Sequence, residues 1–173
     1  ASQRITSHGQ ANVADTAVGG FRERWISSFD GQRIQYWIVT PPGLDQSKKY
    51  PAILYIHGGP HSMYGQTFFH EFQVLANAGY VVIYGNPRGS TGYGGEFGNV
   101  IQNRYPGDDA KDLVATVDDA VSLGFIDAGR IGVAGGWGGG VLSSWLIGTW
   151  PDKFKAAVVE RAVLDWRQMS GSD

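Results

Sequence analysis

Residues 131 to 145 read IGVAGGWGGGVLSSW, which is an apolar β-like run, a cluster of glycines and a helix-like segment. A strand, a tight turn and a helix in this order can present a nucleophilic side chain from a strained position, because small neighbours let the strand and helix approach. The centre of the glycine cluster holds Trp137. Indole carbon is not a nucleophile and the indole N–H is only a donor, whereas acyl transfer needs an activated hydroxyl or thiol beside a base. The segment therefore has the pattern of a catalytic turn without its nucleophile.

Other residues that could bind a ligand or take part in catalysis are weaker candidates. His57 and His61 have a spacing that raises the question of a metal site, but Gly-Gly-Pro between them disfavours a helix and no carboxylate stands at ligand spacing. The glycines of residues 85–98 are not followed by Gly-Lys-Ser/Thr, so they do not form a phosphate loop. Ser143 and Ser144 fall inside the helix-like segment, where we expect them to face the backbone or pack. We expect no metal and no cofactor.

The elements that must position these residues alternate along the chain. Two β-like runs, residues 22–29 and 32–40, flank Asp30-Gly31, which is a strong hairpin signal. Continuous apolar runs typical of buried strands cover residues 52–59, 80–86, 130–135 and 155–163. Helical spacing covers residues 66–79, 108–124 and 140–150. The pattern predicts an α/β fold of three layers, with a mostly parallel sheet, helices on both faces and an antiparallel N-terminal hairpin at one edge.

The glycines mark where a site should lie. The chain has 26 glycines in 173 residues, about twice the ordinary share of ~7 %. They cluster at residues 58–59, 85–98 and 135–140, each time after a β-like run. In parallel sheets the ligand crevice lies beyond the carboxyl ends of the strands. We therefore expect these three loops to surround one crevice.

The bulk properties exclude several classes of function. The chain is 42 % hydrophobic and 17 % charged, as in globular proteins, and its net charge of −2 gives no case for binding nucleic acid or an anionic membrane. It has no cysteine, which excludes disulfides and cysteine catalysis. No signal-peptide pattern opens the chain, and we expect a cytoplasmic protein. Residues 1–20 carry no strong periodicity and are expected to form an N-terminal arm or the remnant of a link to an upstream part, with one domain over residues 21–173.

Five segments resemble, in their order and spacing, the catalytic domain of the prolyl oligopeptidase family, and most closely its acylaminoacyl-peptidase branch. They read SSFDGQRIQYWIVTPPG, YPAILYIHGGPHSMYG, NPRGSTGYGGEF, GDDAKDLVATVDDAV and RIGVAGGWGGG. The resemblance covers nearly all of residues 20–165. It implies an α/β-hydrolase fold and a serine peptidase or esterase lineage that acts on acylated peptides or small esters.

The resemblance also shows where this chain departs from the family. In the family the turn reads Gly-Gly-Ser-Tyr-Gly-Gly. In this chain the four outer glycines match, Trp137 takes the place of the nucleophilic serine, and Gly138 takes the place of the tyrosine. The family's acid and base follow later in its chain than the position matched by Asp173. The resemblance therefore implies a hydrolase domain that is incomplete at the C-terminal end and lacks nucleophile, acid and base. We expect Gly138 to relax the strained turn beside Trp137.

The remaining site residues follow from the same resemblance. Gly59 and Gly138 would supply the backbone N–H groups of an oxyanion hole, although both glycines could serve only as tight turns. Arg88 could bind a ligand carboxylate or carbonyl, or form a salt bridge with a local acid such as Glu96. The predicted pocket comprises His57, Gly58, Arg88, Tyr93, Trp137 and Asp165, of which Asp165 is expected at the rim or in a structural role.

Three hypotheses for function stay open. The chain is an incomplete form of a serine hydrolase without triad activity; or it binds a small ester or peptide non-covalently, with weak triad-independent esterase activity as a variant; or it is a folded fragment or scaffold without native activity. A sheet that lacks its last strands exposes an apolar edge and one poorly covered face. We therefore expect a homo-oligomer, or completion of the sheet by another chain.

Overall fold

The computed structural model describes residues 5–6, 8 and 15–172. Most of the arm expected over residues 1–20, and Asp173, lie outside these residues. Within the described part of the chain, no helix is long and apolar enough to cross a membrane.

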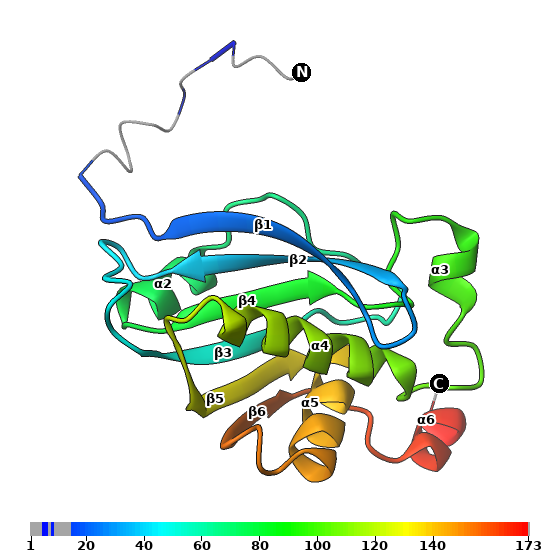
Figure 1. Cartoon of the computed structure of the whole chain (residues 1–173). Coiled ribbons are helices and arrows are strands. Elements are labelled where there is room, and N and C mark those ends of the chain that lie inside the picture. The colour runs from blue at the N-terminus through cyan, green and yellow to red at the C-terminus, as the bar shows by residue number, and fades with distance from the viewer. Residues whose placement is uncertain (1–4, 7, 9–14, 173) are drawn as a thin grey trace.

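A mixed sheet of six strands forms the centre of the molecule (Figure 1). The strands are β1 (Gly20–Ser27), β2 (Arg33–Thr40), β3 (Tyr50–Ile56), β4 (Val81–Asn86), β5 (Ile126–Gly136) and β6 (Ala156–Glu160). Their order across the sheet is β1-β2-β4-β3-β5-β6. The β1–β2 and β2–β4 pairings are antiparallel, and all others are parallel. This topology confirms the predicted α/β fold with an antiparallel N-terminal hairpin.

Helices cover the sheet on both sides. They are α2 (His70–Asn77), α3 (Gly95–Asn99), α4 (Asp108–Ser122), α5 (Gly138–Thr149) and α6 (Trp166–Ser172). The larger apolar core lies between the sheet and the α4–α5 layer, and a smaller aromatic core lies between the sheet and α2. Figure 1 places α3 and α6 at the end of the sheet toward which β4 and β5 run. The sequence pattern predicted neither of these two short helices.

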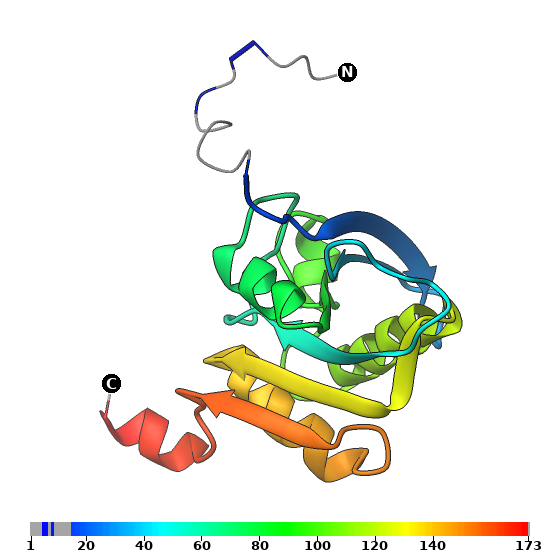
Figure 2. The same cartoon turned by 90° about the vertical axis from the view of Figure 1, so that its left-hand side faces the viewer.

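The last strand differs from its prediction. Residues 155–163 were expected to form a buried strand, but β6 is short and Val158 and Val159 are 56 % and 40 % exposed. The reason is position: β6 is the outermost strand, and α2 packs on β2 and β4, from which β6 is separated by β3 and β5 (Figure 2). A groove of about 590 Å³ runs along the sheet face beside β6. The described sheet therefore carries an uncovered apolar surface at β6.

Candidate functional site

Trp137 lies at the turn between β5 and α5, and its backbone is strained. Its φ of 57° and ψ of −121° are rare for a residue with a side chain, and such conformations cost about 1–3 kcal/mol. Two hydrogen bonds hold it there: its N–H donates to the Glu160 carbonyl over 3.0 Å, and its own carbonyl accepts from Val141 N–H over 3.1 Å. Gly138 was expected to relax this turn. It begins α5 without a positive φ, so the strained conformation stays at Trp137.

The glycines beside Trp137 allow α5 to begin directly against strand backbone. A Cβ atom at Gly139 would overlap the Ile56 carbonyl oxygen at the end of β3, and one at Gly140 would lie 2.7 Å from the Glu160 carbonyl oxygen. Both approaches are far closer than van der Waals contact. The glycine cluster in the sequence therefore reflects close packing of α5 onto β3 and β6.

The N–H group of Gly138 points out of the first turn of α5. It belongs to the same peptide as the Trp137 carbonyl, which bonds along the helix to Val141, and in a trans peptide the N–H and C=O groups point in opposite directions. The first N–H groups of a helix have no acceptor within it and form the positive end of its dipole. This end of α5 therefore presents a donor suited to a carbonyl or anionic oxygen.

Gly59 presents a second donor from the loop after β3. The Gly58 carbonyl oxygen lies 2.7 Å from His57 Nδ1, so the Gly59 N–H of the same peptide points away from His57. The two loops touch, since a Cβ atom at Gly138 would lie 2.8 Å from the Gly59 carbonyl oxygen. Within the described part of the chain, neither N–H has a protein acceptor. The structure thus brings together the two glycines that the sequence singled out.

We call the Gly59 and Gly138 N–H groups together the donor corner. His57 lies beneath it and is 9 % exposed. Its Nε2 atom lies 2.9 Å from Ser90 Oγ, and its ring packs edge-on against Tyr64. Burial lowers the pKa of the imidazole. His61 lines a separate open groove of about 460 Å³ together with Trp166. Among the described residues, no group of three or more His, Cys, Asp or Glu side chains is placed to hold a metal.

The guanidinium group of Arg88 is paired with two carboxylates of the protein. Its guanidinium Nε and Nη2 atoms each lie 2.8 Å from an oxygen of Asp112, and Nη1 lies 2.8 Å from Asp30 Oδ2. The side chain is 6 % exposed. The salt-bridge interpretation of Arg88 therefore fits the structure, with Asp112 and Asp30 as partners rather than Glu96.

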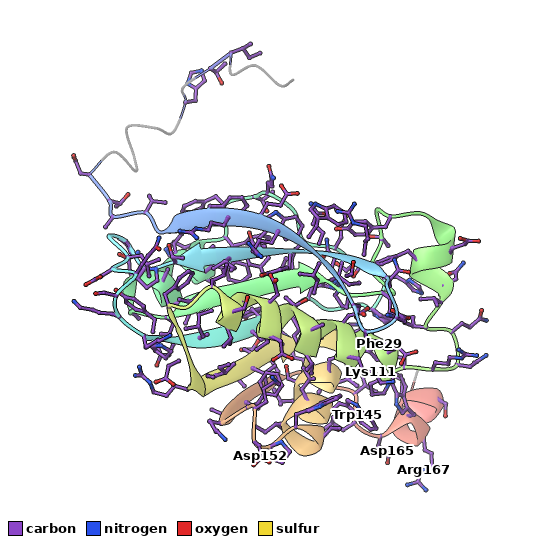
Figure 3. The ribbon with its side chains drawn as sticks, viewed as in Figure 1. Phe29, Lys111, Trp145, Asp152, Asp165 and Arg167 are labelled. Atoms are coloured by element: carbon purple, nitrogen blue, oxygen red, sulfur yellow. The ribbon has the colours of Figure 1, made fainter. Side chains whose placement is uncertain are left out.

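Tyr93 and Asp165 lie in local networks of their own. The Tyr93 hydroxyl donates to Gln35 Oε1 over 2.6 Å and accepts from Asn86 Nδ2 over 2.7 Å. Asp165 accepts from the Arg167 backbone N–H over 3.0 Å at the start of α6, and Figure 3 shows the two residues together there. Their contacts are structural: Tyr93 ties β2 to β4, and Asp165 begins α6.

Two residues near the corner escaped the sequence interpretation. The Tyr105 hydroxyl donates to the Gly138 carbonyl over 2.7 Å. Asp109 is 1 % exposed, and its Oδ2 atom has no partner among the described residues. A signal for Asp109 was present, because Asp109 and Asp112 share a helix face with the buried Leu113. Acids on the apolar stripe of a helix indicate buried polar contacts.

Known proteins resemble this chain in sequence and structure. The sequence pattern of the Prolyl oligopeptidase family matches residues 66–173. The "Uncharacterized peptidase YuxL" of Bacillus subtilis is 47 % identical over 170 residues, which are 98 % of this chain and 26 % of that protein. The acylamino-acid-releasing enzyme of Arabidopsis thaliana is 38 % identical over 135 residues, covering 78 % of this chain and 18 % of that protein.

Solved structures give the same relationship. An acylaminoacyl peptidase of Pyrococcus horikoshii superposes with a TM-score of 0.86 at 30 % identity, over 95 % of this chain and 26 % of that one. The chain spans about a quarter of the length of the first of these relatives. The matched family, the shared α/β-hydrolase fold and the glycine-flanked turn agree, and the chain belongs to the prolyl oligopeptidase family.

Proposed function

We propose that this chain binds the carbonyl or carboxylate oxygen of a peptide-like or ester-like ligand without forming a covalent bond to it. The observation that carries the proposal is the position of Trp137, whose side chain is 49 % exposed at the strained turn beside Gly59 and Gly138. Peptidases and an acylamino-acid-releasing enzyme among the relatives support an acylated peptide as ligand.

The roles of the residues follow from their chemistry. The N–H groups of Gly59 and Gly138 donate to the ligand oxygen, and the positive end of α5 favours negative charge on it. The half-exposed indole offers an apolar surface for the neighbouring part of the ligand. No bond forms, because the indole carries no nucleophile, and both ring nitrogens of His57 already face protein oxygen atoms. Cleavage by a triad within this chain is therefore expected to be absent.

A calorimetric titration tests the proposed site. N-acetyl-phenylalanine supplies both an acyl group and a carboxylate, and we expect saturable binding to the unmodified protein. Gly138→Ala should weaken binding at least about tenfold, or ~1.4 kcal/mol, because its Cβ atom would push against the Gly59 carbonyl at 2.8 Å. Gly148→Ala is the matched control, since a Cβ atom there meets nothing within 4 Å. Equal affinities in both variants would contradict the proposal.

An ester assay separates binding from catalysis. With a p-nitrophenyl ester and a serine-directed phosphonate, we expect neither triad turnover nor covalent labelling, and Trp137→Ser should behave the same way. Labelling together with turnover would refute non-covalent binding. Turnover without labelling would instead support hydrolysis by water at the donor corner, which is the second function this geometry allows.

The surroundings of the site are also part of the proposal. The exposed valines of β6 support self-association or pairing with another chain. A cytoplasmic location stays a prediction from the sequence.

A further inference from the structure

A small cavity lies beneath the donor corner, between the loop after β3 and the start of α4. Its volume is about 10 Å³, at the lower end of the space in which proteins hold one water molecule. The polar side chains that line it belong to His57, Arg88, Ser90, Tyr105 and Asp109. None of these side chains has a role in the ligand contacts proposed above.

The contacts of His57 require more protons than a neutral imidazole supplies. His57 Nδ1 lies 2.7 Å from the Gly58 carbonyl, His57 Nε2 lies 2.9 Å from Ser90 Oγ, and Ser90 Oγ lies 2.7 Å from the Pro87 carbonyl. Carbonyl oxygens only accept, so three hydrogen bonds need three protons. A neutral histidine and a serine carry two between them. An imidazolium and a serine carry three, and all three contacts are then hydrogen bonds.

Asp109, on the other side of the cavity, lacks among the described residues a hydrogen-bond partner for one carboxyl oxygen and lacks a counter-charge. One carboxyl oxygen accepts from the Gly107 N–H over 2.5 Å, but the other has no protein partner although the residue is 1 % exposed. A buried carboxylate without a counter-charge is costly. A cation across the same cavity would supply that counter-charge.

We propose that His57 and Asp109 form a buried ion pair across this cavity, with the proton on the imidazole and with one water molecule that donates to Asp109 Oδ2 and to Ser90 Oγ. Asp109 is thereby a positioning residue for the Gly58–Gly59 peptide. The imidazolium donates to the Gly58 carbonyl and so directs the Gly59 N–H to the opposite side. The inference goes beyond the proposed function and needs no ligand to be tested.

Burial by itself disfavours the charged form of each group. It lowers the pKa of His57, and it raises the pKa of Asp109 to about 6. The opposite charge across the cavity and the additional hydrogen bond of the imidazolium oppose this effect and favour the proton on His57.

The other charged and titratable groups around the cavity are already paired or stay neutral, so they do not replace His57 as the partner of Asp109. Arg88 is saturated by Asp112 and Asp30. The Tyr105 hydroxyl donates to Gly138, and burial raises its pKa, so it stays neutral. Tyr64 touches the His57 ring only edge-on, and its pKa is likewise raised by burial. Along α4, the Asp112 charge acts to raise the pKa of Asp109, but Asp112 is paired with Arg88, which offsets that charge.

Nitrogen-15 NMR of histidine-labelled protein decides where the proton is. His57 is assigned by loss of its signals in His57→Gln. We expect both ring nitrogens of His57 to be protonated at about pH 7, above the ordinary histidine pKa of ~6.5. In Asp109→Asn, His57 should titrate at least about one unit lower, which is a tenfold loss of proton affinity.

Asp108→Asn is the matched control. It removes the same charge one residue away, from a side chain that is 41 % exposed and pairs with Lys111, and it should leave the His57 titration unchanged. A neutral His57 at about pH 7 in the unmodified protein overturns the proposal even if Asp109→Asn fails to fold. An equal shift in both variants, or no shift in Asp109→Asn, also overturns it.

Discussion

Replacing Trp137 with alanine and, separately, with glycine measures the strain at the turn. Both variants lose the buried half of the indole, about 100 Å² or ~2.5 kcal/mol at 25 cal/mol/Å². Glycine alone removes the penalty of a Cβ atom at φ 57°, about 1–2 kcal/mol, and gives back ~0.5–1 kcal/mol as added freedom of the unfolded chain. Trp137→Gly should therefore be more stable than Trp137→Ala by roughly 0.5–1 kcal/mol.

Urea unfolding followed by circular dichroism measures the difference between the two variants. Ser144 provides the control, because it lies within α5 at an ordinary helical position. There the sign should reverse, with glycine less stable than alanine by ~1 kcal/mol. If alanine equals or exceeds glycine at Trp137 as well, the turn does not hold the positive φ in solution, and the reasoning about its strain fails.

Three further predictions concern the rest of the fold. Asp112→Asn should lower the unfolding free energy by about 3–5 kcal/mol because it leaves Arg88 buried beside a neutral amide, whereas Asp127→Asn at an exposed pair should cost under ~1 kcal/mol; comparable losses in urea unfolding would contradict this. The hydrogen bond from Arg88 lowers the pKa of Asp30 to about 2, so stability should fall as the pH drops from about 4 toward 2. In Asp30→Asn the melting temperature measured by thermal unfolding should depend less on pH over that window. The exposed β6 edge should cause self-association that Val158→Lys reduces; sedimentation that shows a monomer at micromolar concentration would refute it.

Local sequence signals predicted the parts of the fold that depend on them. Continuous apolar runs located β3, β4 and β5, and Asp30-Gly31 located the hairpin, although its loop runs from Ser28 to Gln32. The partners of Arg88 could not be predicted, because Asp112 is 24 residues away and Asp30 is 58 residues away. Only packing of the hairpin loop against α4 brings these groups together.

The site was predictable where backbone geometry defines it and not where side chains meet across the fold. Gly59 and Gly138 could be identified from the family resemblance, and the structure places them after β3 and β5, whose carboxyl ends share one edge of the sheet. Tyr105 reaches Gly138 from a loop that the sequence pattern does not orient. The exposed β6 shows the same limit, since an apolar run predicts burial only if a neighbouring element covers it.

The conformation of the turn at Trp137 does not depend on the side chain that it presents. Its positive φ is held by backbone hydrogen bonds to Glu160 and Val141, neither of which depends on the side chain at position 137. The close approach of α5 depends on the glycines around it and likewise not on that side chain. A strained turn of this kind therefore does not depend on which side chain stands at its centre, and its presence supports the family relationship without by itself supporting acyl transfer. What the backbone fixes independently of that side chain is the direction of the N–H donors, and that property is the one the proposed ligand binding uses.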